Sequence, residues 1–207
     1  MFSLIRRSRL RRLLIEVGEL RAMVRTDQLT GLLNRLVLEE AADRSRGPVG
    51  LLLLDLDGFK QINDVHGHRT GDALLFAVAE RLTDLTGGPD GDGVTFAARL
   101  HGDEFAIWLG RTDRATATRR AAEVSAALAE PYTLPGGLRL RVTASVGAAV
   151  GAAPVDVETL LADADAAMYQ AKRARRANRA VSLPSNPARP TARAHRDDQA
   201  SADETAA

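Results

Sequence analysis

The chain has 207 residues, of which 45% are hydrophobic, and its formal net charge is +1. This length fits one domain with extensions, and the small charge gives no reason to expect a nucleic acid partner. The absence of cysteine excludes disulfides and thiolate metal sites. No apolar run approaches the roughly 18 residues of a membrane-spanning helix. The first residues also lack a signal-peptide pattern, so we expect a cytoplasmic protein.

Residues 1–26 are predicted to form a basic helix. Its apolar residues are spaced three and four apart, as in a coiled-coil seam: Leu10, Leu13, Val17, Leu20 and Val24. The same stripe fits a helix packed against its own domain, and both interpretations stay open. Several arginines near the start favour a solvated basic end, with peripheral contact to an anionic membrane as the alternative.

Residues 27–181 alternate between strand-like and helix-like patterns. The apolar run at 49–56 predicts a buried strand. Further strands are expected within 95–109, where two would be joined at HGDE, and at 138–150, and helices at 72–85, 115–129 and 156–176. Interleaved strands and helices predict an α/β (α+β) domain, in which a sheet is covered by helices.

Residues 182–207 form the third part of the chain. They contain Pro184, Pro187 and Pro190, followed by charged and small residues with almost nothing apolar. Such a composition cannot bury enough surface to offset the entropy cost of ordering. We therefore predict a disordered tail.

Two carboxylates mark the end of the predicted strand at 49–56. Asp55 and Asp57 are two residues apart, so they share a face of the strand, with the carbonyl of Leu56 between them. Oxygen ligands of this kind suit Mg²⁺. An EF-hand also begins Asp-x-Asp, but here Gly58 stands at loop position 4 instead of 6, and His66 takes position 12, where glutamate is needed.

A second carboxylate pair, Asp103 and Glu104, lies at a glycine-containing turn between two apolar runs. Two strand ends with carboxylates, brought together in a sheet, would make a metal site. A metal that bridges phosphates recurs in phosphoryl and nucleotidyl transfer. The amides at 58–60, where strand turns to helix, could hold those phosphates. Asn63 and Asp72 carry groups that can read the edge of guanine.

Five ordered motifs, taken together, resemble the GGDEF domain of diguanylate cyclases. They are DQLTGLLNR at 27–35, DLDGFKQINDVHGHRTGD at 55–72, HGDEF at 101–105, ASVGAA at 144–149 and ADAAMYQAK at 164–172. The resemblance implies a central, mostly antiparallel sheet flanked by helices, as in nucleotide cyclases and polymerase palms. It also implies condensation of two GTP molecules into cyclic di-GMP with release of pyrophosphate. Each domain would hold one GTP, so the active form would be a homodimer.

The resemblance assigns a role to each matching residue. Asp55, Asp103 and the carbonyl of Leu56 would hold Mg²⁺, with Mn²⁺ as an alternative. Asp103 would also act as general base for the ribose 3′-hydroxyl, and Glu104 would add negative charge at the metal. Lys60 would contact the reacting phosphate, and Asn63 and Asp72 would contact guanine. The phosphates would be held by the amides of Gly58 and Phe59 and by the side chains of Lys172 and Arg176. Other motif residues would serve the fold: Leu29, Leu32 and Phe105 in the core, Asn34 and Arg35 at a turn and helix end, and Met168 and Tyr169 in packing.

The sequence departs from the family pattern at the signature itself, where His101 replaces the first glycine. Glycine serves where the backbone needs a positive φ or where a ligand passes close to the Cα atom. Gly102 and both carboxylates are retained, so we predict an active cyclase. The alternative is a catalytically degenerate module that binds GTP and signals through protein contacts.

Two further departures lie on either side of the signature. Many family members bind product through an Arg-x-x-Asp motif, whose ends are Asp92 and Thr95 here. We therefore predict no product inhibition at that position. After Lys172 the family commonly has Gly-Arg-Asn, whereas this chain has Arg175, Arg176, Ala177 and Asn178.

Overall fold

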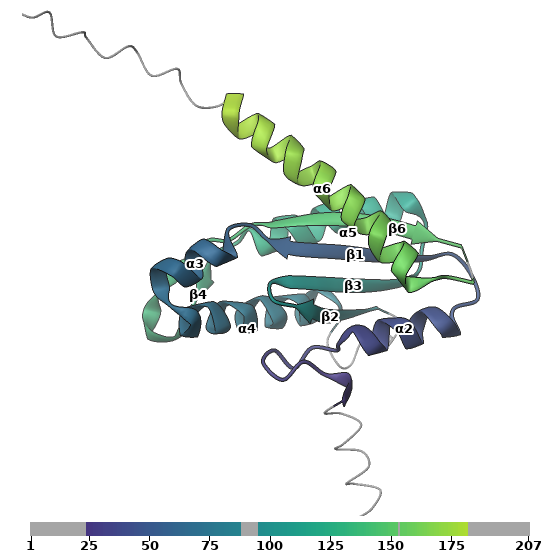
Figure 1. Ribbon diagram of the computed structural model, residues 1–207, viewed down its shortest axis with the longest axis horizontal. Coiled ribbons are helices and arrows are strands. Elements are labelled where there is room, and N and C mark those ends of the chain that lie inside the picture. Colours follow the sequence, from purple (N-terminus) through teal and green to yellow (C-terminus); the bar gives the residue numbers. More distant parts are fainter. Residues whose placement is uncertain (1–23, 88–94, 153, 182–207) are drawn as a thin grey trace, which may run out of the picture.

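The computed structural model describes residues 24–87, 95–152 and 154–181 (Figure 1). The expectations for residues 1–23, for Asp92 and for the tail at 182–207 lie outside these residues. The elements are α2 (Arg35–Arg44), β1 (Val49–Leu56), α3 (Phe59–His66), α4 (His68–Leu85), β2 (Phe96–His101), β3 (Glu104–Arg111), α5 (Arg114–Leu128), β4 (Tyr132–Thr133), β5 (Arg139–Leu140), β6 (Ala144–Gly151) and α6 (Val157–Val181). Among the described residues, no helix is long and apolar enough to cross a membrane.

A four-stranded sheet forms the centre of the domain. Its strand order is β2-β3-β1-β6, and every neighbouring pair is antiparallel. A separate two-stranded sheet pairs β4 with β5. This arrangement confirms the α+β class and the mostly antiparallel sheet.

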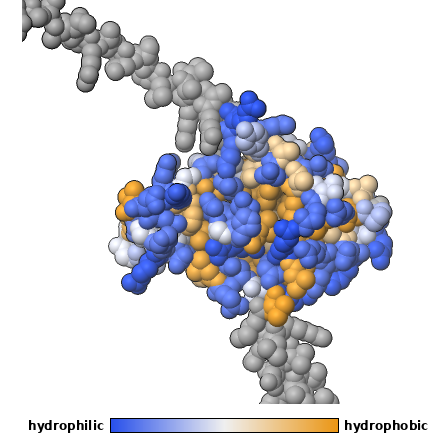
Figure 2. Space-filling model, viewed as in Figure 1, coloured by the Kyte–Doolittle hydropathy of each residue, from blue (hydrophilic) through white to orange (hydrophobic). Residues whose placement is uncertain are grey.

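Alternate residues of β1 point into two separate cores. Leu52 and Leu54 pack with residues of α4 and α5 on one face, whereas Leu51 and Leu53 pack with residues of α2 and α6 on the other. A strand buried on both faces needs apolar residues at every position, which explains the continuous run LLLL. Figure 2 shows hydrophilic side chains over much of one face of the molecule, with apolar ones in its middle.

Three predicted element boundaries were wrong, one of them the end of the last helix, because α6 continues to Val181 instead of ending at 176. Helix α4 begins at His68, four residues before the predicted start, because the single residue Gly67, with φ of 82°, turns the chain between α3 and α4. The strand predicted at 138–150 is broken between β5 and β6. At the break, Thr143 bonds to Asp57: its carbonyl accepts from the Asp57 amide at 2.8 Å, and its hydroxyl donates to the Asp57 carboxylate at 2.7 Å.

Three packing predictions were confirmed and two were wrong. Leu32, Phe105 and Met168 are buried, but Leu29 is 37% exposed and Tyr169 is 59% exposed. Leu29 lies in a surface turn that the Asp27 amide closes on the carbonyl of Leu32. Tyr169 follows Met168 by one residue, so it turns about 100° away from the buried stripe of α6.

The contacts expected for Asn34 and Arg35 are present. The Asn34 side-chain amide donates to the carbonyl of Val24 at 2.7 Å. Arg35, at the start of α2, forms ion pairs with Glu39 and with Glu158 of α6. Asn34 therefore stabilises the turn before α2, and Arg35 connects α2 to the first turn of α6.

Candidate active site

The end of β1 and the turn between β2 and β3 lie side by side. Asp55 pairs with Glu104 in the sheet register, and the Leu56 amide donates to the carbonyl of Asp103 at 3.3 Å. Pairing of β1 with β3 therefore brings the two predicted carboxylate groups together, although 48 positions of sequence separate Asp55 from Asp103. All four residues are buried or half-buried.

Lys172 of α6 reaches this group of carboxylates. Its Nζ atom lies 2.6 Å from Oδ1 of Asp55, and both side chains are mostly buried. The predicted phosphate-binding lysine is thus placed at the carboxylates. Arg176 lies one turn further along α6, and its side chain is outside the part of the chain that the structure describes.

The electrostatics of the site act most strongly on Asp103. Burial raises the pKa of its carboxyl above the ordinary value, and the charge of Asp55 raises it further. The cationic Lys172 and the imidazole of His101 lower the same pKa, but they do not cancel the increase. A half-buried carboxyl with a raised pKa, beside a second carboxylate and a lysine, is a candidate for proton transfer or metal binding.

His101 is the last residue of β2 and pairs with Glu104 across the turn. Its side chain is 74% exposed, and its Nε2 atom lies 3.3 Å from Oε2 of Glu104. The left-handed residue of this turn is Gly102, with φ of 52°. The conformational requirement for glycine therefore falls on Gly102, which the chain retains, and crowding of a ligand is the remaining consequence of the histidine.

Asp57 does not join Asp55 as a free ligand. Its carboxylate accepts hydrogen bonds from the hydroxyls of Thr143, at 2.7 Å, and of Ser145, at 2.8 Å. The Ser145 side chain is fully buried. Asp57 thus fastens the end of β1 to β6. The stretch TAS carries these two hydroxyls two residues apart, which is the sequence signal for this contact.

Sequence analysis also missed the role of Arg99. Its Nε and Nη2 atoms donate to the carbonyl of Gly102 at 3.0 and 2.7 Å, and its Nη1 atom donates to Oδ1 of Asp27 at 2.9 Å. The Asp27 carboxylate also accepts from the amide and hydroxyl of Thr30. Burial raises the pKa of Asp27, but these hydrogen bonds outweigh it, so that the pKa is lowered. Arg99 thereby connects the turn before α2 to the signature turn.

The helices that follow β1 carry the other predicted substrate contacts. Gly58, with φ of 78°, turns the chain from β1 into α3, and Phe59 and Lys60 form the first turn of that helix. Asn63 lies half-buried in α3, and Asp72 lies exposed in α4. Helices α3 and α4 pack together, because only Gly67 separates them. The side chains predicted to read guanine therefore lie on neighbouring helices.

The donor set fits a hard divalent cation that also binds phosphate. Two carboxylates, from Asp55 and Asp103, and the carbonyl of Leu56 supply oxygen ligands, and Mg²⁺ usually completes its shell with water and substrate phosphates. Among the described residues, no three His, Cys, Asp or Glu side chains form a complete protein-only cage. The residues therefore fit a metal that arrives with a nucleotide better than a permanently held ion.

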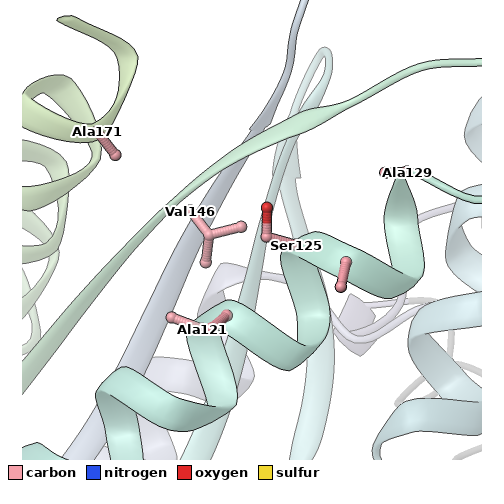
Figure 3. A pocket seen from close by; sticks show the side chains of 7 residues that line it. Ala121, Ser125, Ala129, Val146 and Ala171 are labelled. Atoms are coloured by element: carbon pink, nitrogen blue, oxygen red, sulfur yellow. The ribbon is translucent and has the colours of Figure 1, made fainter. Parts of the chain in front are cut away.

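A hollow of about 480 Å³ lies between α5 and α6 over β6 (Figure 3), and none of the carboxylates lines it. Its walls come from small residues, chiefly alanines of α5, together with Val146 of β6 and Ala171 of α6. Ser125 supplies its one hydroxyl. The lining holds no charged group for catalysis, so the carboxylate site is the candidate active site.

Comparison with known proteins identifies the family. The model of the diguanylate cyclase GGDEF domain matches residues 24–178, and the chain belongs to this family. The chain is 36% identical over 156 residues to the bifunctional diguanylate cyclase/cyclic di-GMP phosphodiesterase MucR of Pseudomonas aeruginosa, covering 70% of this chain and 22% of that protein. It is 36% identical over 173 residues to the diguanylate cyclase DosC of Escherichia coli, covering 79% and 36%.

A solved structure shows the same fold. The coiled coil and GGDEF domain of DgcB from Caulobacter crescentus, in complex with c-di-GMP, is 27% identical to this chain with a TM-score of 0.71. The match covers 81% of this chain and 90% of that one. The chain spans only 22% and 36% of the two curated relatives named above. Similarity to these longer proteins therefore supports their activities for this chain only as proposals.

Proposed function

We propose that this protein is a Mg²⁺-dependent diguanylate cyclase, which condenses two GTP molecules into cyclic di-GMP. The observation that carries the proposal is the meeting of Asp55, Leu56 and Asp103 at two strand ends, with Lys172 against them. Membership of the GGDEF family supports it. Because GTP is a cytoplasmic nucleotide, the proposed compartment is the cytoplasm.

Each residue has a defined task in this mechanism. Asn63 and Asp72 hold the guanine, and the amides of Gly58 and Phe59 receive phosphate oxygens at the start of α3. Lys172 exchanges its ion pair with Asp55 for the substrate phosphates, where Arg176 adds a second positive charge. Bound Mg²⁺ (or Mn²⁺) supplies charge neutralisation at the phosphates.

Formation of each phosphodiester bond needs one proton acceptor and one leaving group. The carboxylate of Asp103 takes the proton of the ribose 3′-hydroxyl. The 3′-oxygen then bonds to the α-phosphorus of the second GTP, and the bond to the β-phosphate breaks to release pyrophosphate. Lys60 stabilises the negative charge that develops, and Glu104 contributes negative charge near the metal. The 3′-oxygen of the second GTP then bonds in the same way to the α-phosphorus of the first, which releases the second pyrophosphate and closes the ring.

Two such domains must face each other, because each holds one of the two GTP molecules. We propose that the segment at 1–26 sets this homodimer through its apolar stripe. Replacing both Leu13 and Val17 with aspartate should then give a monomer by size-exclusion chromatography with light scattering. An unchanged dimer in that variant would contradict this assignment and would leave the basic segment free for membrane contact.

A degenerate GTP-binding module is the second candidate, and the exposed imidazole of His101 beside Glu104 favours it. The deciding experiment incubates the purified protein with GTP and Mg²⁺ and follows cyclic di-GMP by mass spectrometry. Product from the parent protein that vanishes in Asp103→Ala would establish the cyclase. Product from His101→Gly alone would establish a cyclase silenced at the turn. No product from either, with GTP binding retained, would favour the module.

A further inference from the structure

Helix α4 meets α3 at a glycine with no room for a side chain. A Cβ atom added to Gly71 would lie 1.9 Å from Oδ1 and 2.9 Å from Cγ of Asn63, and 3.2 Å from Cζ of Phe59. The first two separations are far below van der Waals contact. The carboxamide of Asn63 therefore fills the volume that a side chain at position 71 would occupy.

Backbone conformation does not explain this glycine. Gly71 lies within α4 and is absent from the glycines of positive φ, whereas its neighbour Gly67 has φ of 82° and open space around it. A glycine inside a helix is less favourable for stability than an alanine. Close approach of the Asn63 carboxamide is the feature of the structure that accounts for this cost.

The orientation of Asn63 follows from the same contact. Its Oδ1 atom is buried and has no hydrogen-bond partner among the described residues, although the residue as a whole is only half-buried. The side-chain amide of Asn63 is thus oriented by packing against Gly71, a task that a hydrogen bond usually performs. The buried Oδ1 end faces Gly71 of α4, and the NH₂ end is the group available for a ligand. Asp72, the next residue after Gly71, is exposed on the same pair of helices.

We propose that Gly71 is a positioning residue for base recognition: the missing side chain fixes the Asn63 carboxamide in the orientation that reads guanine. This inference rests on the proposed function, since it assumes that Asn63 meets the base. An alanine at position 71 would push the carboxamide out of place, since the three atoms nearest to its Cβ belong to the side chains of Asn63 and Phe59 and none belongs to the carboxylates or to Lys172. Guanine affinity should fall, and affinity for the triphosphate part should not.

The test measures binding by calorimetry, with Mg²⁺ and the α,β-methylene analogues of GTP and ATP, which cannot release pyrophosphate. Gly71→Ala should bind the GTP analogue about 10-fold to 100-fold more weakly, as expected for loss of one buried hydrogen-bonding group. The affinity for the ATP analogue, which is weak in the parent protein, should differ by less than about threefold between Gly71→Ala and the parent, because the variant loses no contact with that analogue. The matched control is Gly47→Ala, where a Cβ atom would make only an ordinary contact, 3.6 Å from the Arg111 side chain.

A double-mutant cycle separates positioning from a general effect on folding. In an Asn63→Ala background, Gly71→Ala should cause no further loss, and the double variant should unfold thermally no earlier than Asn63→Ala. If Gly71→Ala alone fails to fold, recovery of folding in the double variant would still identify Asn63 as its partner. Equal GTP-analogue affinity in Gly71→Ala and the parent would overturn the inference, as would an equal loss for both analogues. A parent protein that binds neither analogue would instead overturn the proposed function.

Discussion

Lys172 and Asp55 form an ion pair of 2.6 Å that joins α6 to the end of β1 across 117 positions of sequence. The ammonium group therefore lies at the carboxylates that we assign to the metal. Its charge lowers the pKa of Asp103, whereas burial and Asp55 raise it, and the increase prevails. The folded protein is thus less stable when Asp103 is ionised than when it is protonated, and this difference can be measured.

The first prediction concerns Asp103→Asn in the absence of metal. Because the folded-state pKa lies above the usual value of 3.8, the folded protein binds more protons than the unfolded chain between the two values. Stability therefore falls as pH rises through this window and stays lower above it. The substitution removes the charge, so the variant should unfold at a higher temperature than the parent at neutral pH, and the difference should vanish once the pH is below both pKa values. Thermal unfolding followed by circular dichroism checks this.

Mg²⁺ with the non-reacting GTP analogue provides the matched comparison. A ligand that binds only the folded state stabilises it according to its concentration and affinity. The parent should therefore gain stability on addition, and Asp103→Asn should gain much less. An equal gain in both proteins would contradict the assignment of Asp103 to the metal.

The second prediction concerns Arg99, which donates to both Gly102 and Asp27. Lysine keeps the charge but lacks the planar fork that serves two acceptors at once. Arg99→Lys should lower the free energy of unfolding by about 1–3 kcal/mol, and cyclase activity should fall at least about tenfold, roughly 1.4 kcal/mol in barrier terms. Urea unfolding and product assays check both, with the exposed Arg139→Lys of β5 as control. Full activity in Arg99→Lys would show that the signature turn holds its shape without this contact.

The third prediction compares the two residues of the signature turn. His101 is exposed at the end of β2, whereas Gly102 carries the positive φ of 52°. Gly102→Ala should therefore destabilise the protein by about 1 kcal/mol or more and reduce activity. His101→Gly should leave the unfolding temperature nearly unchanged, and its activity reports on crowding of GTP together with loss of the imidazole near Asp103 and Glu104. A large loss of stability in His101→Gly would show that the imidazole contact with Glu104 supports the turn.

The fourth prediction concerns the contact between β6 and α6. A Cβ atom on Gly147 would lie 2.0 Å from the Ala164 carbonyl oxygen and 2.4 Å from the Met168 amide nitrogen, both backbone atoms that cannot rotate away. Gly147→Ala should cost about 3 kcal/mol or more in stability, as for severe overpacking. It should also reduce activity, since α6 carries Lys172. Gly151→Ala, in the same strand, is the control, because its Cβ atom would meet only side chains at 3.4 Å.

The main strands, most helices and the meeting of the carboxylates could be predicted from the sequence, because apolar periodicity and the family motifs are local signals. Contacts made by ordinary polar residues could not. The bond from Arg99 to Gly102 and Asp27, and the hydroxyls of Thr143 and Ser145 on Asp57, depend on which segments become neighbours. Leu29 was assigned to the core because leucine in a motif suggests packing, but its turn leaves it at the surface.

The order in which residues leave the ribosome gives the Lys172–Asp55 pair a further consequence. Asp55 and Asp103 are made early, and the sheet register that joins them needs no residue after Arg111. Lys172 lies on the last described helix, so the cation reaches the carboxylates only when nearly the whole domain has been synthesised. A nascent chain that lacks α6 holds acidic groups without their counter-charge. Completion of the proposed nucleotide site is thus coupled to completion of the fold.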